Sequence, residues 1–458
     1  MIRFGTDGWR AVIGEGFTFE NVRRVARAHA EVLKDKGLYK VLVGYDRRFL
    51  SERFALEVCR VMASEGLEPV LTRTPCTTPM VSFGVRYMGF DNGVMITASH
   101  NPPEYNGYKI KESFGGSART EFLREVESRI REEPVFTSDR NPREIDLEDT
   151  YLEKILSFFD PDLFKEKEIL LIHDPMHGTS AGLLARALTD TKVRVLTIRS
   201  QRDPLFGGFS PEPVERNLRI LSEKVRSLSA DLGVANDGDG DRVGLVDEKG
   251  RFVSTQVVYA LLLYHQIKNR GRREGVVVKT VSTTYLADRI CEEEGIQLRE
   301  VPVGFKNVNE VILKEKVIFG GEESGGYGFP EFLPERDGVF SALMILEMML
   351  LTGGSVSDLI SRLFRTYGES HYRRVDLRAD ERVKDKLKDL VKDPPAKLGS
   401  RSVDRAITID GLKLVFRDGS WILIRPSGTE PLVRIYAEAP SPEEAEALIR
   451  AGEDLIAV

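Results

Sequence analysis

The chain has 458 residues, of which 41% are hydrophobic and 30% charged, and its formal net charge is −6. At roughly 100–200 residues per domain, this length predicts three or four domains of a globular protein. An acidic balance without a long basic block argues against a nucleic-acid partner, and no hydrophobic run approaches the ~18–20 residues of a membrane span. The start, MIRFGTDGWR, has no hydrophobic signal core, so we expect a cytoplasmic protein whose three dispersed cysteines are reduced thiols: Cys59, Cys76 and Cys291.

Strand and helix signals alternate over residues 1–130. A hydrophobic run at 40–46 ends in Asp46, and residues 51–66 carry hydrophobic side chains at helical spacing until Gly66 ends the pattern. A strand is predicted at 68–75 (EPVLTRTP), another at 93–96 (GVMI), and a helix at 120–133. Strands that alternate with helices predict a mostly parallel sheet with helices on both faces.

Three further units follow a predicted linker at 131–150, which is polar, contains two prolines and has no period. The second unit is expected to start at the strand EILLIHDP (168–175), continue through a helix near 212–228 and reach the strand ADLGVAND (230–237). The third runs from residue 252 and contains GVVVKTVS, KVIFGG and the helix GVFSALMILEMMLL. The last unit reads as antiparallel strands with a turn at Asp418-Gly419, then a helix capped by Ser441 with Pro442 in its first turn.

The predicted fold is therefore α/β with four domains around a central cleft. Three similar α/β units with mixed, mostly parallel sheets precede a C-terminal α+β domain, and the predicted boundaries are 1–138, 150–250, 251–367 and 371–458. In three places a strand runs directly into polar residues: GVMITAS, LGVAND and VIFGGEE. Because ligands bind at the carboxyl ends of strands in open parallel sheets, these three loops and a fourth are expected to converge on one site.

The first of these loops, TASHNP (97–102), places a hydroxyl, an imidazole and an amide directly after a buried strand. Ser99 beside His100 suggests a hydrolase dyad, but a nucleophile and its base must face each other across space, which adjacent residues rarely do. The sequence therefore does not favour a Ser99–His100 hydrolase dyad.

The second loop, NDGDGDR (236–242), carries Asp237, Asp239 and Asp241 at alternate positions. Gly238 and Gly240 allow the backbone to curl and bring the three carboxylates together. Oxygen ligands without Cys or His favour Mg²⁺ over Zn²⁺. An EF-hand is rejected, because its sixth position would be an arginine instead of glycine and the flanking segments are strand-like.

Two more loops have the composition of anion-binding and sugar-binding sites. RPSGTEP (425–431) offers a planar guanidinium for phosphate, two hydroxyls and a glycine that lets backbone N–H groups approach an anion, with Arg434 nearby. GGEESGG (320–326) fits no nucleotide-binding template, but Glu322 and Ser324 suit the vicinal hydroxyls of a sugar. We call residues 425–431 the phosphate loop and residues 320–326 the sugar loop. Together with an acidic metal site near Ser99, these two loops predict a phosphoserine that exchanges phosphate with a phosphorylated sugar.

Taken in order, the motifs FGTDGWR, TASHNP, NGYK, DGDGDR, VGFKNV, GEESGG and RPSGTEP resemble those of the α-D-phosphohexomutase superfamily, which includes phosphoglucomutase and phosphomannomutase. The resemblance covers the whole chain. It implies that Ser99 is phosphorylated in the resting enzyme and donates its phosphate to a hexose 1- or 6-phosphate. The resulting 1,6-bisphosphate would turn over in the cleft and return its other phosphate to Ser99.

The resemblance also implies the site residues. One Mg²⁺ per chain would be bound by a Ser99 phosphate oxygen, Asp237, Asp239 and Asp241. Catalytic positions besides Ser99 would be Arg10, His100, Lys109 and Arg242, of which Lys109 matches the family's general acid/base. Glu322 and Ser324 would bind the sugar 3- and 4-hydroxyls. The other substrate-binding positions would be Lys279, Gly304, Phe305, Arg425, Ser427, Gly428, Thr429 and Arg434.

The sugar loop bears on substrate choice. It ends Ser324-Gly325-Gly326, whereas dual mannose/glucose enzymes of the family commonly have His at the last position, and Glu323 stands where phosphoglucosamine mutases usually have Gln. We therefore expect glucose as the preferred sugar, followed by dual glucose/mannose activity and then glucosamine, with a pentose phosphate left open. A sugar 1,6-bisphosphate is the expected activator, and a monomer and a homodimer are both left open.

Two alternative functions, outside the mutases, are also left open. A sugar-phosphate phosphatase would use the same phosphoserine with water as acceptor, although domain closure normally excludes water and a second phosphate loop would then lack a purpose. A catalytically inactive binding protein of the same fold would not need the intact set of Ser99, Arg242 and three aspartates.

Overall fold

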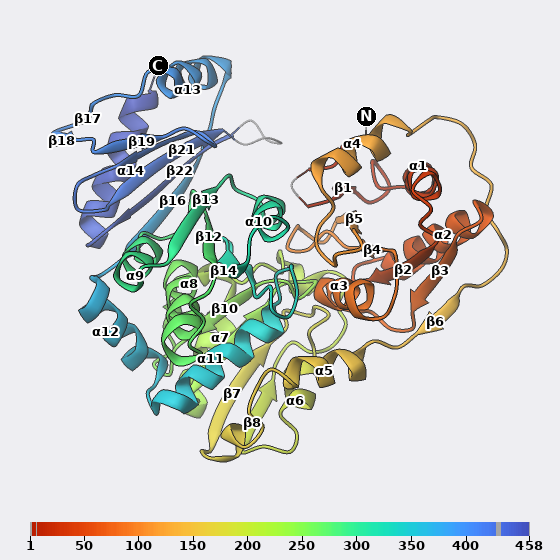
Figure 1. The fold of residues 1–458 in the computed structure, drawn as a ribbon, viewed down its shortest axis with the longest axis horizontal. Helices are drawn as coiled ribbons and strands as arrows, with labels where there is room; N and C mark the ends of the chain where they lie inside the picture. Colours follow the sequence, from red (N-terminus) through yellow and green to blue (C-terminus); the bar gives the residue numbers. More distant parts are fainter. Residues whose placement is uncertain (1, 6, 427–431, 458) are drawn as a thin grey trace.

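The first unit, domain I, is built on a sheet with the strand order β1-β5-β4-β2-β3-β6. The computed structural model describes residues 2–5, 7–426 and 432–457 (Figure 1). Strands β4, β2, β3 and β6 are parallel, whereas β5 and β1 are antiparallel to their neighbours. The elements are β1 (Trp9–Val12), α1 (Phe19–Asp35), β2 (Lys40–Tyr45), α2 (Ser51–Ser64), β3 (Glu68–Thr72), α3 (Thr78–Tyr87), β4 (Asn92–Ile96), β5 (Tyr105–Lys111), α4 (Thr120–Ser128) and β6 (Arg143–Ile145).

The alternation of side chains along β2 shows how the helices cover this sheet. Val41 and Val43 point into a core formed with α1, α2 and α4, whereas Leu42 points to the opposite face, toward α3 and α5 (Glu148–Leu156). Strand β6 lies within the segment predicted as a linker. It was missed because it is a three-residue, largely exposed edge strand without hydrophobic alternation.

Domain II has the strand order β11-β10-β9-β7-β8, with β9, β7 and β8 parallel and β10 and β11 antiparallel. Helix α7 covers one face, where Ile172, Leu221 and Val225 pack together, and the other face joins a core shared with domain III. The elements are β7 (Ile169–Asp174), α6 (Leu183–Ala187), β8 (Val193–Thr197), α7 (Arg219–Leu228), β9 (Leu232–Asn236), β10 (Val243–Val246) and β11 (Phe252–Val253).

Domain III has the order β13-β12-β14-β15, of which only β15 is antiparallel. Helix α10 covers one face, and α8, α9, α11 and α12 lie on the other side. The elements are α8 (Thr255–Tyr264), β12 (Val276–Thr280), α9 (Leu286–Glu294), β13 (Gln297–Val301), α10 (Phe305–Ile312), β14 (Val317–Gly321), β15 (Tyr327–Gly328), α11 (Gly338–Thr352) and α12 (Val356–Tyr367).

Domain IV is a fully antiparallel sheet, β16-β22-β21-β20-β19, as the sequence predicts for its C-terminal strands. Helices α13 and α14 cover one face, and Ser441 caps α14 by accepting a hydrogen bond from the Glu444 amide. The elements are β16 (His371–Arg378), α13 (Glu381–Lys392), β17 (Lys397–Leu398), β18 (Arg401–Ser402), β19 (Arg405–Ile407), β20 (Leu412–Val415), β21 (Trp421–Pro426), β22 (Leu432–Ala439) and α14 (Pro442–Ile456).

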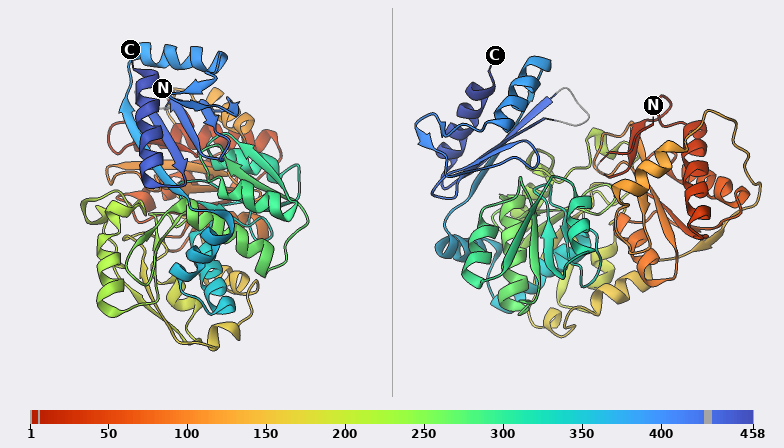
Figure 2. Two further views of the ribbon diagram at one scale, coloured as in Figure 1. Left: turned by 90° about the vertical axis from the view of Figure 1, so that its left-hand side faces the viewer. Right: turned by 45° about the horizontal axis from the view of Figure 1, so that its top comes forward.

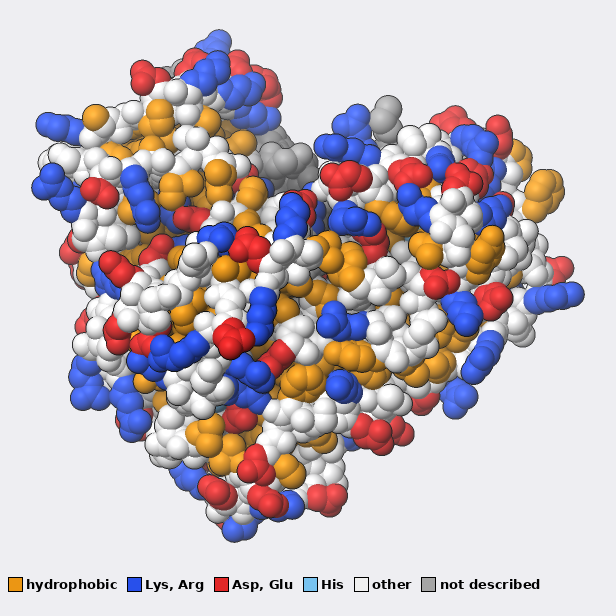
Figure 3. Space-filling view, in the orientation of Figure 1, with side chains coloured by type: hydrophobic (Ala, Val, Ile, Leu, Met, Phe, Trp, Pro, Cys, Tyr) orange, Lys and Arg blue, Asp and Glu red, His pale blue; other side chains and the backbone are white. Residues whose placement is uncertain are grey.

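The domains are joined by buried side chains as well as by the chain. Helix α11 is buried on nearly every side because it lies between β9 and β10 of domain II and α8 of domain III. Domain IV is attached to domain III through the buried carboxylate of Glu438, which accepts hydrogen bonds from Tyr285 N at 2.8 Å and Trp421 Nε1 at 2.7 Å. Domains I and IV lie apart in the ribbon views (Figures 1 and 2), and the surface is hollowed between them (Figure 3).

The helices are short compared with the thickness of a membrane. Among the described residues, no single helix is long and hydrophobic enough to cross one. Helices α11 and α12 satisfy that test only when taken as a pair, and their axes differ by 81° at the break between them.

Candidate active site

The same local structure presents a polar loop in each of the first three domains. A buried strand ends, a short loop follows, and an antiparallel strand returns beside it: β4 and β5, β9 and β10, β14 and β15. Ser99 lies in the first loop, the three aspartates in the second and Glu322 in the third. The flanking elements of the aspartate loop are strands, which agrees with the rejection of an EF-hand.

Ser99 is buried and lies next to the aspartate loop. Its hydroxyl donates a hydrogen bond to Asp237 Oδ2 at 2.8 Å, and Oγ lies 3.2 Å from His100 Nδ1. Its backbone has φ = 54°, in the left-handed region, which is uncommon for a non-glycine residue and requires support from the surroundings. The Ser99 hydroxyl is therefore hydrogen-bonded to a carboxylate of domain II.

The three aspartates form a compact oxygen cluster. Asp237, Asp239 and Asp241 are fully buried, and one carboxylate oxygen from each lies within 4.8 Å of the others. Among the residues that the structure describes, Asp239 Oδ1 and Asp241 Oδ1 have no hydrogen-bond partner. Buried, unpartnered carboxylate oxygens in a set without Cys or His are suited to Mg²⁺.

Lys109 extends from β5 into this cluster. Its ammonium lies 2.7 Å from Asp7 Oδ2, 2.8 Å from Asp239 Oδ2 and 3.2 Å from Asp241 Oδ2. Burial alone would lower the pKa of Lys109, but the surrounding carboxylates raise it above its ordinary value. Lys109 is therefore charged at neutral pH and offsets part of the negative charge of the cluster.

The remaining protonation states follow from burial and neighbouring charge. Burial, together with the charges of Asp241 and Asp239, raises the pKa of Asp237 well above its usual value. Burial and then the Arg242 charge lower the pKa of His100 well below its usual value, so the imidazole beside Ser99 is neutral at pH 7. A neutral imidazole can accept or donate a hydrogen bond at Ser99 without adding charge.

The two predicted catalytic arginines contact residues that follow Ser99 in the chain. Arg10, on β1, donates from Nη1 to Asn101 Oδ1 at 2.6 Å. Arg242 follows the aspartates; its backbone N–H donates to Asp237 Oδ1 at 3.1 Å and its guanidinium Nη2 lies 3.5 Å from His100 Nε2. The structure thus brings together all the predicted catalytic residues and metal ligands.

Sequence reasoning missed Arg336, a buried side chain just before α11. Its Nη2 lies 2.7 Å from Asp7 Oδ2 and 2.8 Å from Asp241 Oδ2, and its Nη1 lies 3.4 Å from Glu322 Oε2. Arg336 therefore links domains I, II and III through one guanidinium. No local pattern marks it, because its partners are distant in the sequence and PERDG reads as an ordinary polar turn before a helix.

The sugar loop lies on the other side of Arg336. Burial raises the pKa of Glu322 to about 7, although Arg336 opposes the shift. Glu322 Oε1 accepts a hydrogen bond from Gly304 N at 3.0 Å, and Phe305, the first residue of α10, places its ring 5.5 Å from the Arg336 guanidinium. Ser324 Oγ is buried and has no hydrogen-bond partner within the described part of the chain.

The remaining predicted substrate contacts belong to domains III and IV. Lys279 donates to Thr284 O at 3.2 Å and pairs with Asp288, so its ammonium is held near the junction of domains III and IV. Arg425 and Arg434 are opposite each other on β21 and β22. Three predicted phosphate-binding residues lie outside the described residues: Ser427, Gly428 and Thr429.

Asp410 is a second residue that the sequence analysis did not single out. Its Oδ2 accepts hydrogen bonds from Arg425 Nε at 2.7 Å and from Val303 N at 2.9 Å. It thus connects the start of the phosphate loop in domain IV with the residue before Gly304 in domain III.

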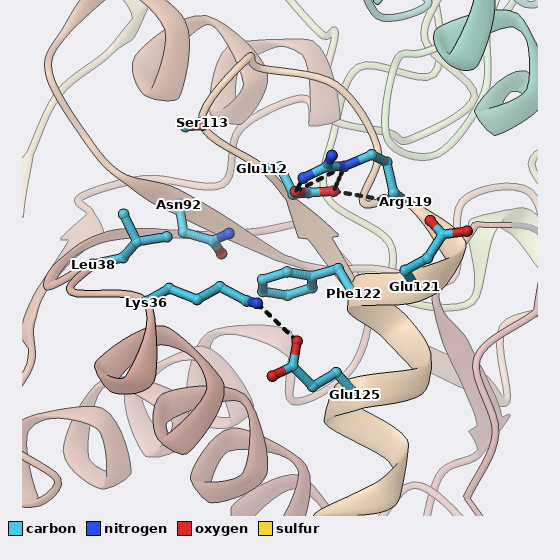
Figure 4. A pocket seen from close by; sticks show the side chains of 9 residues that line it. All are labelled: Lys36, Leu38, Asn92, Glu112, Ser113, Arg119, Glu121, Phe122 and Glu125. Carbon is cyan, nitrogen blue, oxygen red and sulfur yellow. Dashed lines mark hydrogen bonds and ion pairs between the residues drawn. The ribbon is translucent and has the colours of Figure 1, made fainter.

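A separate pocket of about 410 Å³ lies at the amino end of β4, where Asn92 forms part of its wall (Figure 4). Its cations are already paired: Lys36 lies 2.8 Å from a Glu125 oxygen, and Arg119 Nη2 lies 2.7 Å from Glu112 Oε2. Ser99 follows the opposite end of the same strand. We therefore assign this pocket no part in the chemistry at Ser99.

Models of four family domains match the chain in order. They are described as phosphoglucomutase/phosphomannomutase, alpha/beta/alpha domains I, II and III and C-terminal domain, and they match residues 1–135, 149–250, 255–367 and 374–453. The chain belongs to this family. The four-domain fold expected from the sequence and the resemblance to the α-D-phosphohexomutases are thereby confirmed.

Relatives of this phosphohexomutase match over nearly the full length. A Thermococcus kodakarensis phosphoglucomutase/phosphomannomutase is 32% identical over 99% of this chain and 98% of its own length. A Sulfurisphaera tokodaii phosphoglucosamine/phosphogalactosamine mutase is 33% identical, with 97% of each chain covered. A solved structure of a proposed phosphomannomutase from Thermus thermophilus has 35% identity, a TM-score of 0.89 and 99% coverage of both chains.

Membership fixes the class of reaction. Phosphohexomutases are isomerases that transfer phosphate intramolecularly, so this chain is an enzyme of that class that acts on a phosphosugar. The family depends on Mg²⁺, and Asp237, Asp239 and Asp241 provide a cluster able to bind it. Neither the family nor the relatives decide which sugar this chain prefers, because their names include glucose, mannose and glucosamine enzymes.

Proposed function

We propose that this phosphohexomutase interconverts glucose 1-phosphate and glucose 6-phosphate through a phosphoserine at Ser99 and a glucose 1,6-bisphosphate intermediate. The observation that carries the proposal is the 2.8 Å contact between the Ser99 hydroxyl and Asp237 in a buried acidic cluster. A serine held there is next to the residues that would neutralise a transferring phosphoryl group. The bisphosphate would also serve as the activator that phosphorylates Ser99.

The proposed chemistry uses few side chains. The bond between phosphorus and Ser99 Oγ breaks as phosphorus bonds to a sugar hydroxyl oxygen, and the hydroxyl proton passes to a base. Mg²⁺, held by the three aspartates and a Ser99 phosphate oxygen, would supply positive charge for this transfer. Lys109 is proposed as the general acid/base: with Mg²⁺ on the aspartates, the carboxylate charge that raises the pKa of Lys109 would be offset, so that the amine could release and take up a proton. In its charged form Lys109 would, with Arg10 and Arg242, supply further positive charge. His100 is proposed to orient the loop or the phosphate.

The sugar and its second phosphate are assigned to domains III and IV. Glu322 and Ser324 are proposed to bind the 3- and 4-hydroxyls; the unpartnered buried hydroxyl of Ser324 supports this role. Gly304 and Phe305 would line the same part of the cleft, and Lys279 is proposed to contact the substrate nearer to domain IV. The non-reacting phosphate is assigned to domain IV: Arg425, Ser427, Gly428, Thr429 and Arg434.

Gly326 supports the proposed preference for glucose. A Cβ added at Gly326 would clash with Arg336 Cδ, so the histidine found there in dual-specificity enzymes does not fit beside Arg336 as it lies. Glu323 gives a weaker argument than its sequence position suggested, because its carboxylate accepts a hydrogen bond from Ser282 Oγ at 2.6 Å within domain III. Glucosamine phosphate is therefore the second candidate, favoured by the name of the Sulfurisphaera relative.

The test is kcat/KM with Mg²⁺ and a trace of the matching bisphosphate on the 1-phosphates of glucose, mannose, glucosamine and ribose. A glucose preference above about tenfold, equivalent to ~1.4 kcal/mol in the transition state, is expected. Equal rates for glucose and mannose, or a glucosamine preference, would overturn the proposed sugar. Release of inorganic phosphate at the rate of substrate loss would instead indicate a phosphatase.

A further inference from the structure

Arg48 is a fully buried arginine that the reaction described above does not use. Its guanidinium donates four hydrogen bonds to backbone carbonyls of the segment that contains Ser99. Nη2 donates to Ser99 O at 2.6 Å and to Asn101 O at 2.7 Å. Nη1 donates to Pro102 O at 2.8 Å and to Tyr105 O at 3.1 Å. One side chain therefore fixes the path of residues 99–105, called here the Ser99 loop.

Asp46 and Thr97 complete this arrangement and reach the Ser99 amide. Arg48 Nε lies 3.2 Å from Asp46 Oδ2, which also accepts a hydrogen bond from Thr97 Oγ1 at 2.6 Å. Thr97 Oγ1 in turn accepts from Ser99 N at 2.8 Å. The amide and the carbonyl of Ser99, whose φ is in the left-handed region, are thus both held by one cluster: Asp46, Arg48 and Thr97, called here the Arg48 cluster.

A segment of domain II closes the outer side of the Arg48 cluster. The ring of Phe206, which is itself buried, lies 4.9 Å from the Arg48 guanidinium. Two hydrogen bonds fasten this segment to domain I: Arg47 Nη1 donates to Ser200 O at 2.7 Å, and Arg202 Nε to Arg47 O at 3.4 Å. The same domain carries the aspartate loop, so the cluster lies at the contact that sets Ser99 against the metal ligands.

Stability alone does not explain a buried ion pair at this place. Burial raises the pKa of Asp46 and lowers that of Arg48, which shows that the surroundings disfavour both charges. A buried ion pair is often no more stabilising than well-packed hydrophobic residues of the same volume. A planar guanidinium, however, can hold four carbonyls in fixed directions, which a lysine ammonium on a flexible stem cannot do.

We propose that the Arg48 cluster is a positioning device that holds the Ser99 loop so that the seryl oxygen is in line for phosphoryl transfer. The inference rests on the proposed phosphoserine at Ser99. Phosphoryl transfer depends on in-line placement more than on covalent chemistry, and a displacement of about 1 Å can lower the rate by about 10²-fold. Loss of the four carbonyl contacts should therefore slow the chemical step.

The test is a rapid-quench single turnover that starts from phosphorylated enzyme and saturating hexose phosphate. The amplitude measures the fraction of competent enzyme, and the rate constant measures the chemical step, so a merely structural role would reduce only the amplitude. We expect Arg48→Lys to lower the rate constant at least about tenfold. The matched control is Arg27→Lys, a buried arginine of α1 whose Nη1 lies 3.4 Å from Pro134 O, and its rate constant should stay within about twofold of wild type.

Thr97 provides a second pair of variants in case Arg48→Lys fails to fold. Thr97→Val removes the hydroxyl that binds the Ser99 amide, whereas Thr97→Ser keeps it, so only the valine variant should lower the rate constant. Wild-type rate constants in Arg48→Lys or, where that variant is unfolded, in Thr97→Val would overturn the proposal. A wild-type enzyme that never carries phosphate at Ser99, measured by intact mass, would instead overturn the proposed function itself.

Discussion

Replacing Arg336 by methionine is the most direct test of the charge network between the domains. The guanidinium is buried and lies within 3.5 Å of four carboxylates: Asp7, Asp241, Glu322 and Glu335. Methionine is unbranched and fills similar space, so the change removes charge and hydrogen bonds more than volume.

The expected loss of stability depends on which carboxylates still have a cation beside them after Arg336 is removed. Asp7 and Asp241 remain beside Lys109, at 2.7 and 3.2 Å, and Glu335 remains paired with Lys111. Among the described residues, Glu322 has no second ion pair. Because removal of one partner of a buried pair lowers stability by about 3–5 kcal/mol, and only one carboxylate loses its partner, we expect about 3 kcal/mol at pH 8.

The loss of stability in Arg336→Met should depend on pH because Glu322 changes its charge near neutral pH. Its pKa in the folded protein is about 7, raised by burial from an ordinary value of 4.5, and removal of Arg336 raises it further. An acid whose folded pKa is raised binds more protons when folded, so stability falls as pH rises through the folded pKa. Wild type and variant are both protonated at Glu322 near pH 6 and diverge above pH 7, by about 1.4 kcal/mol for each pH unit. About 1.4 of the ~3 kcal/mol expected at pH 8 therefore depends on pH, and the remainder, from the other lost contacts of the guanidinium, should be present at pH 6 as well.

Urea unfolding, followed by circular dichroism in EDTA at pH 6 and pH 8, measures the loss of unfolding free energy and its dependence on pH. The control is Arg401→Met, at a partly exposed arginine of domain IV that pairs with Asp418 at 2.6 Å and should contribute less than about 1 kcal/mol at either pH. The reasoning is refuted if Arg336→Met loses no more than the control at pH 8, or if its loss is the same at both pH values.

Further predictions concern turnover. Ser99→Ala should lower kcat at least about 10³-fold with an unchanged circular dichroism spectrum, and near-wild-type turnover with added bisphosphate would remove Ser99 from the mechanism. EDTA should abolish turnover and Mg²⁺ should restore it; full activity in EDTA would contradict the metal assignment. Arg425→Ala should mainly raise KM, whereas a pure loss of kcat would place Arg425 in domain closure. Asp410→Ala should shift KM in the same direction as Arg425→Ala, because Asp410 orients that guanidinium; an unchanged KM would argue against this role.

The fold was predictable where strands and loops have local signals. The order of strands and helices follows from hydrophobic periodicity, and the end of β9 in three alternating aspartates identifies a cation site without any tertiary information. Ser99 could be placed near that cluster because both follow the carboxyl ends of strands. These predictions needed only the pattern of each segment and one general rule about parallel sheets.

The contacts between domains were not predictable in the same way. Arg336, Arg48 and Asp410 act through partners that are distant in the sequence, or through backbone carbonyls that carry no sequence signal. Edge strand β6 was missed because three largely exposed residues are too few to show a period. A single sequence gives the type of a loop more readily than the side chains that hold it against another domain.

The geometry of the site suggests why these long-range contacts are arginines. Each of the first three domains presents its loop on an antiparallel pair of strands, but nothing within a pair sets its position relative to the other two. Arg336 contacts Asp7, Asp241 and Glu322, one from each domain, and Arg48 fixes the Ser99 loop where domain II covers it. A planar guanidinium with five donors can satisfy several acceptors in fixed directions at once. The precision that phosphoryl transfer requires would therefore come from these two buried side chains as well as from the loops that carry the chemistry.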